Sequence, residues 1–94
     1  MVRYVLPKDV DSKLRELFTP EYLKDKVPEC VEEVEVRGSK RLVNRCVKSS
    51  VQVDLTRVPA VTMLVYEVDK KLDDYFLKNK NDPRIQELLK YRVG

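Results

Sequence analysis

The sequence predicts a small single-domain α+β protein, because helical and strand-type patterns occupy separate parts of the chain. Its 94 residues suffice for one modest hydrophobic core. Apolar residues recur at helical spacing between residues 10 and 18 and again between 61 and 76. Between 51 and 55, apolar and polar residues alternate as in a half-buried strand. The predicted order is therefore helix, β-meander, helix, helix.

The first thirty residues predict a short strand followed by two helical segments. Residues 2–6 (VRYVL) are a short strand candidate, and Pro7 ends it. From Lys8 the spacing becomes helical, with Asp9 as the expected N-cap, and this N-terminal helix ends before Thr19-Pro20 because the residue before a proline avoids helical geometry. Thr19 then caps a second short helix over 20–26.

An antiparallel β-hairpin or meander is expected over about 30–55. Val34 and Val36 alternate with acidic residues, and Gly38-Ser39 is a suitable two-residue type II′ loop, with glycine at the position that needs a positive φ. Residues 48–50 predict a turn or bulge, and 51–55 form the next strand.

A long helix is the favoured interpretation of residues 59–79, with Pro59 in its first turn. The competing interpretation is a buried strand over the β-branched run 60–68, followed by a shorter helix from Asp69. A C-terminal helix is expected over about 83–92, capped by Asp82 and started by Pro83.

The hairpin register decides what the only two cysteines can do. With Gly38-Ser39 as the loop, Glu32 faces Arg45, and Cys30 and Cys46 point to opposite sides of the ribbon. A three-residue loop would instead place Cys30 opposite Cys46. The two-residue loop favours reduced, packed cysteines, although the composition is thermophile-like, and disulfides do occur inside hyperthermophiles.

A run of basic side chains is the candidate binding site. Between residues 37 and 57 only Asp54 offsets them. A β-ribbon that presents such a row can contact phosphates. Because residues 23–65 contain no Phe, Tyr or Trp, contact with a duplex backbone is favoured over stacking on single-stranded bases. The candidate nucleic-acid-binding residues are Arg37, Lys40, Arg41, Arg45, Lys48 and Arg57, with those at the hairpin tip the best candidates and Arg45 expected to pair with Glu32.

The residue types that most enzymes and zinc sites need are missing. The chain has no histidine, no Cys-x-x-Cys pair and no glycine-rich phosphate loop. We therefore predict no enzyme activity, no cofactor, no metal site and no small-molecule substrate. No apolar run is long enough for a signal peptide or a membrane span, which predicts a cytoplasmic protein without membrane contact.

Two functions from different classes follow. The first is a small non-catalytic nucleic-acid-associated (DNA-binding) protein that uses the basic hairpin, with a net charge of +3 that neither demands nor excludes this partner. The alternative is an accessory subunit that docks on a protein partner, or on itself as a homodimer, through the apolar 59–79 helix, whose first half is apolar nearly all round. The interface residues would be Met63 and Tyr66.

Overall fold

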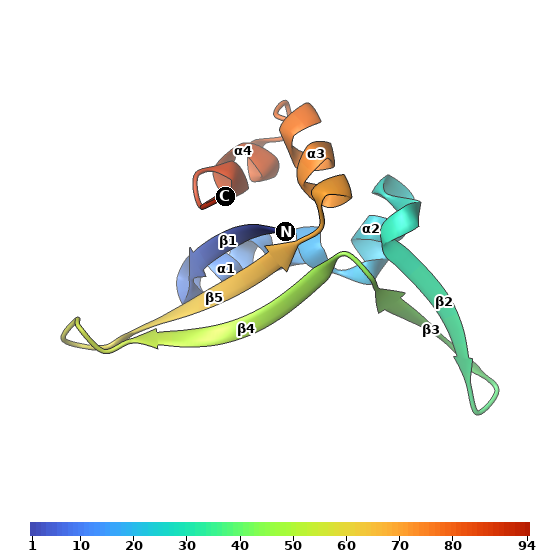
Figure 1. The fold of residues 1–94 in the computed structure, drawn as a ribbon, viewed down its shortest axis with the longest axis horizontal. Helices are drawn as coiled ribbons and strands as arrows, with labels where there is room; N and C mark the ends of the chain where they lie inside the picture. Colours follow the sequence, from blue (N-terminus) through green and yellow to red (C-terminus); the bar gives the residue numbers. More distant parts are fainter.

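The computed structural model describes residues 1–94 and shows a small body from which two β-hairpins project (Figure 1). The elements in chain order are β1 (Val2–Pro7), α1 (Lys8–Leu14), the 3₁₀ turn η1 (Arg15–Phe18), α2 (Pro20–Lys26), the 3₁₀ turn η2 (Pro28–Cys30), β2 (Val31–Val36), β3 (Ser39–Asn44), β4 (Val47–Asp54), β5 (Val61–Val68), α3 (Lys70–Lys78) and α4 (Pro83–Leu89). The predicted α+β class is confirmed.

The strands form two separate antiparallel sheets. β1, β5 and β4 make a three-stranded sheet in that order, with β5 at the centre, whereas β2 and β3 make a two-stranded arm. In the larger sheet Tyr4 lies opposite Tyr66 and Leu6 opposite Leu64. The 30–55 segment is therefore not one meander, because β4 pairs with β5 and not with β3.

The helices cover one face of the three-stranded sheet, and the core lies between. Figure 1 shows α1 behind β1 and β5, with α3 and α4 above the same strands. We call this the helix-covered face; the strands contribute Tyr4, Leu6, Tyr66 and Val68 to it. The helical segments contribute Leu14, Leu17, Phe18, Leu23, Leu72, Phe76, Ile85 and Leu88, all buried. The outer face carries Val5, Met63 and Val65, and no residue of this core cluster lies on it.

The predicted long helix over 59–79 is wrong, and the competing strand is confirmed. Residues 61–68 form β5, which pairs with β1 on one side and β4 on the other. A central strand with apolar residues on both faces reads as a continuous apolar run. The helix begins only at Lys70, where the Asp69 side chain accepts the backbone N–H of Lys71 at 2.9 Å.

Most of the predicted helix ends are confirmed by their caps. Thr19 Oγ1 accepts the Tyr22 N–H at 3.3 Å at the start of α2, and the Asp82 side chain accepts the Arg84 N–H at 2.9 Å at the start of α4. The expected Asp9 cap is wrong, since α1 begins at Lys8 directly after Pro7 and has no side-chain cap.

The predicted hairpin register is also wrong. The loop is Arg37-Gly38, with φ values of 51° and 79°, the two positive angles of a type I′ turn. Glu35 consequently pairs with Lys40, and Val34 with Arg41. Glycine is suitable at the second loop position as well as at the first, so the turn residues do not distinguish the two registers. Contacts at the base of the arm select the observed one.

Those base contacts form a disulfide between Cys30 and Cys46, which corrects the expected reduced cysteines. Asn44 ends β3, because its side-chain oxygen accepts the backbone N–H groups of Cys46 and Val47, each at 3.0 Å. This turn brings Cys46 beside Cys30, with 5.0 Å between their Cα atoms. The Asn44 amide also donates to the Phe18 carbonyl at 2.7 Å, which ties the arm to the body.

Two buried tyrosine–aspartate pairs join the sheet to the helices. The Tyr4 hydroxyl donates to Asp73 of α3 at 2.6 Å, and the neighbouring Tyr66 hydroxyl donates to Asp11 of α1. Burial first, and then the hydrogen bond to the carboxylate, raises the pKa of each tyrosine above its ordinary value. Both hydroxyls therefore remain protonated donors.

Each buried carboxylate also meets an arginine. Arg92 holds both oxygens of Asp73 at 2.9 and 3.0 Å, and Arg15 donates to Asp11 at 2.8 Å. Burial alone would raise the pKa of Asp73, but the hydrogen bonds from Arg92 and Tyr4, together with the arginine charge, outweigh it, so this pKa lies below its ordinary value of 3.8.

We predict that Asp73→Asn lowers the free energy of unfolding at pH 7 by about 2 kcal/mol, since it removes charge-assisted hydrogen bonds. Because the pKa of Asp73 is lower in the folded state, its contribution is present at neutral pH and lost as the pH falls below 3.8. The difference between wild type and variant should therefore shrink in acid when urea unfolding is followed across pH. The exposed helical Asp25→Asn is the control, and a difference that stays constant into acid would contradict the role given to Asp73.

Candidate nucleic-acid interface

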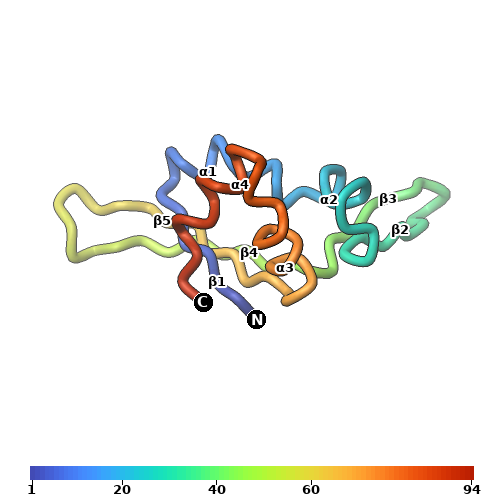
Figure 2. Tube along the Cα trace, turned by 90° about the horizontal axis from the view of Figure 1, so that it is seen from above, coloured from blue at the N-terminus to red at the C-terminus, as the bar shows by residue number.

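The six predicted basic residues do not form one surface. The β2–β3 arm carries Arg37, Lys40 and Arg41, whereas Arg57 lies in the turn between β4 and β5. Figures 1 and 2 show these two hairpins projecting from opposite ends of a molecule that measures 48 × 34 × 22 Å. The structure therefore divides the predicted strip into an arm tip and a separate ribbon.

The arm tip consists of Arg37, Lys40 and Arg41, all exposed and none in an ion pair. Arg37 lies in the turn itself. Lys40 pairs across the ribbon with Glu35, and Arg41 lies opposite the uncharged Val34. Two guanidinium groups at the tip thus have no acid directly across from them.

Arg45 lies at the base of the arm and is paired. Its Nε donates to Glu32 Oε2 at 2.6 Å, and its backbone N–H donates to the Cys30 carbonyl at 2.8 Å. The predicted Glu32–Arg45 pair is therefore present, although the strand register differs from the one that suggested it. Arg45 stabilises the base of the arm beside the disulfide.

Lys48 and Arg57 belong to the β4–β5 ribbon, and each lies near an acid of the same chain. Lys48 pairs across the sheet with Glu67 of β5. Arg57 Nε lies 3.6 Å from Asp54 Oδ2. Hydrogen bonds from Thr56, with a smaller contribution from Arg57, hold the pKa of Asp54 below its ordinary value. Arg57 thus interacts within the ribbon turn, whereas Lys48 lies at the other end of the ribbon, and both are separate from the arm tip.

The predicted interface residues lie in a sheet, not on a helix. Tyr66 is only 7% exposed, because it stacks on Phe18 at 4.1 Å between ring centroids and bonds to Asp11. It is a core residue and offers little surface to a partner. Met63 lies half-buried on the outer face of β5. The apolar docking helix is absent because its residues are the central strand.

Exposed apolar side chains lie instead on the β4–β5 ribbon. Val51, Val53 and Leu55 were predicted to share one face; Val51 and Val53 do, whereas Leu55 lies beyond the end of β4 in the turn. The three side chains extend past the helices and remain 63%, 54% and 81% exposed. Alternation indicated the strand correctly, yet it carries no information on whether a second layer reaches that far. This ribbon is the surface that the sequence pattern failed to identify as exposed.

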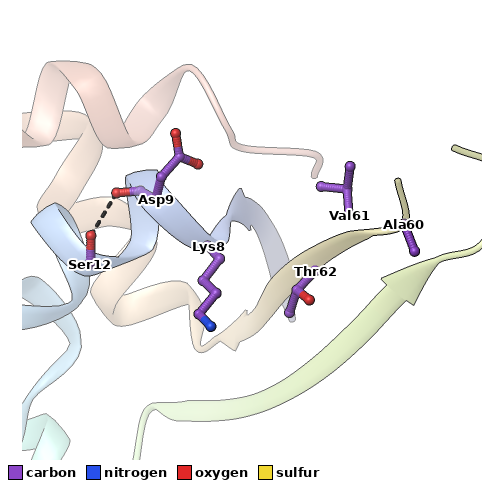
Figure 3. Close-up of a pocket in the computed structure, with 6 residues that line it drawn as sticks. All are labelled: Lys8, Asp9, Ser12, Ala60, Val61 and Thr62. Atoms are coloured by element: carbon purple, nitrogen blue, oxygen red, sulfur yellow. Dashed lines mark hydrogen bonds between the residues drawn. The ribbon is translucent and has the colours of Figure 1, made fainter. Parts of the chain in front are cut away.

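A shallow depression of about 560 Å³ lies between α1 and the start of β5 (Figure 3). Lys8, Asp9 and Ser12 line its helical side, and Ala60, Val61 and Thr62 line the other. The Ser12 hydroxyl donates to the Asp9 carbonyl at 2.7 Å, so it serves as a helix hydrogen bond. The depression therefore offers one amine and one carboxylate on an otherwise largely apolar lining, without a nucleophile–base pair.

Comparison with protein-family models, curated proteins and solved structures finds no match for this chain. None of its helices is long and apolar enough to cross a bilayer. Nowhere do three histidine, cysteine, aspartate or glutamate side chains gather in a group that could hold a metal ion. The arm tip and the β4–β5 ribbon thus remain the two surfaces on which a function can be argued.

We predict that replacing both cysteines by alanine lowers the free energy of unfolding by about 3 kcal/mol, the value expected for opening a loop of this length. The arm should loosen before the body does, because β2 and β3 pair only with each other. Hydrogen exchange should show faster exchange in residues 31–44 and little change in β5. Chemical reduction of the wild type is the matched control and should cause a similar loss. A double-alanine variant as stable as the oxidised wild type would contradict the anchoring role of the disulfide.

Proposed function

We propose that the protein is a small non-catalytic nucleic-acid-associated protein that places the tip of its β2–β3 arm against the phosphates of a duplex. One observation carries the proposal. Arg37, Lys40 and Arg41 are gathered at the end of a projecting arm, exposed and without an ion pair. Such cations gain from a phosphate, because Arg37 and Arg41 have no acid directly across from them and Lys40, although opposite Glu35, forms no ion pair.

The form of the arm supports a duplex as the partner. A two-stranded β-ribbon fits the major groove of DNA. The arm carries no aromatic side chain, so stacking on single-stranded bases does not contribute. Its contacts would be electrostatic and made to the backbone, which gives affinity and orientation with little reading of sequence.

The base of the arm supports the same proposal. The Cys30–Cys46 disulfide, the Arg45–Glu32 pair and the bond from Asn44 to Phe18 hold the arm on the body. An arm held in place loses less conformational entropy when its tip binds. Arg45, Lys48 and Arg57 contribute to structure in this proposal, so phosphate contact narrows from six residues to three.

We predict that reversing Arg37, Lys40 and Arg41 to glutamate abolishes duplex binding. Fluorescence anisotropy with a labelled duplex should give a wild-type slope of log affinity against log salt of about −2.7 if three phosphates are neutralised, since each contributes about −0.9. The triple variant should stay folded, because none of the three side chains is in an ion pair. Its unfolding midpoint should fall only slightly, since Lys40→Glu places a second acid opposite Glu35.

Reversal of Lys13, Lys24 and Lys80 is the matched control. These residues are exposed, form no ion pair and give the same change in net charge, but they lie on or beside the helices. The control should retain most of the binding. A flat salt dependence of the wild type, or equal losses in both variants, would reject the arm tip as a phosphate-binding site.

A further inference from the structure

We propose that β4 is a dimerisation edge, at which two copies of the chain pair antiparallel to form one continuous six-stranded sheet. The inference does not depend on nucleic-acid binding, because the arm tip and β4 lie on separate hairpins. Three features of β4 support this dimer: its open edge, its exposed apolar side chains and the register in which two copies can pair.

The larger sheet has one covered edge and one open edge. Along β1 the C-terminal segment adds further pairing, since the Val93 N–H donates to the Arg3 carbonyl at 2.8 Å and the Val5 N–H donates to the Tyr91 carbonyl at 3.1 Å. On the other side β4 is the outermost strand. Apart from the ladder to β5, no backbone hydrogen bond involves residues 48–54. β4 thus presents a row of free backbone groups.

β4 also lacks the devices that usually protect an edge strand. Its register with β5 runs unbroken from Val47 to Asp54, without a bulge, and the strand contains no proline. It is eight residues long, more than a typical strand. Its only charged side chains are Lys48 near one end and Asp54 at the other.

Exposed apolar side chains on the same strand favour a covered state. Val51 and Val53 share the helix-covered face with Tyr66, but they lie beyond the helices and remain largely exposed. Leu55 continues this row into the turn. A partner strand alongside would bury part of the row, which a single copy leaves in water.

Symmetry and charge select one register. In a two-fold sheet every residue must face a residue of the same side, so one residue of β4 lies opposite its own copy. When that residue is Val51, Lys48 faces Asp54 of the second copy on both sides of the axis, and Ser50 faces Gln52. Any other symmetric register removes both opposite-charge pairs.

The same register covers the projecting ribbon. Val53 comes to lie opposite Ser49 of the second copy. Leu55, in the turn directly after Asp54, comes close to the Val47 end of the second copy's β4. Val47 already packs against the core cluster of its own chain. The apolar end of each ribbon therefore lies against the body of the other copy, which explains why it is long and apolar.

Cross-linking tests the register. Opposite residues in an antiparallel pair have Cα atoms about 4.5–5.5 Å apart, within reach of a disulfide. Val51→Cys should therefore give a covalent dimer on mild oxidation, seen on a non-reducing gel. Val53→Cys alone should not, because its copy lies about four residues away along the strand, roughly 14 Å. Mixing Val53→Cys with Ser49→Cys should restore the cross-link.

Charge exchange tests the pairing without a new thiol. Lys48→Asp alone places two acids opposite each other at each charge pair, and Asp54→Lys alone places two lysines opposite each other. Each variant by itself should have the mass of a monomer in light scattering. An equimolar mixture restores both opposite-charge pairs and should give a heterodimer of twice the chain mass. Because Lys48 also faces Glu67, and Asp54 accepts hydrogen bonds from Thr56, each variant changes a contact within its own chain; recovery in the mixture shows that both variants are folded.

The outcomes decide the proposal. A wild-type dimer with the cross-links and charge recovery described supports it. A wild type that stays monomeric over a concentration series overturns it, and so does a dimer in which Val53→Cys cross-links as readily as Val51→Cys. A dimer unaffected by either charge variant would place the interface elsewhere and equally reject β4.

Discussion

The fold depends on the need of two neighbouring buried tyrosines for hydrogen-bond acceptors. Tyr4 and Tyr66 lie opposite each other on β1 and β5, and both form buried hydrogen bonds. A buried hydroxyl without a partner costs several kcal/mol, and a buried carboxylate without one costs more. Asp73 and Asp11 satisfy the hydroxyls, and Arg92 and Arg15 in turn compensate the carboxylates.

This pair of networks determines where the other elements lie. Asp11 holds α1 and Asp73 holds α3 over the same face of the sheet, so both helical layers share one core. Arg92 brings the C-terminal segment beside β1, where Tyr91 and Val93 extend the pairing. One edge of the sheet is therefore closed by the chain itself, and β4 is left as the open edge.

Both surfaces proposed to bind partners lie outside this core. The arm is attached through the disulfide and the Asn44 bonds, and the β4–β5 ribbon extends beyond the helices. Substitutions at the arm tip or at β4 should therefore affect binding more than stability. A two-fold dimer through β4 would carry two arm tips, and two linked sites bind a common duplex more tightly than one.

Local patterns alone determined the α+β class, the caps at Thr19 and Asp82, the position of the β2–β3 hairpin and the strand character of 51–53. These features depend on side chains that act on their own backbone or on the next few residues. The Glu32–Arg45 contact was also predicted, but from a different register; it forms because Arg45 lies two residues beyond Val43, the residue opposite Glu32, and so reaches Glu32 diagonally.

The tertiary structure decided the rest. Whether 61–68 is strand or helix depends on β1 and β4 as partners, because an apolar β-branched run fits either state when buried on every side. Gly38 suits two loop positions, so the register and the Cys30–Cys46 bond depended on how Asn44 turns the chain against the body. The tertiary structure also decided that Tyr66 is buried and Val51 exposed. Burial depends on how far the helices reach across the sheet, and no local sequence pattern encodes that distance.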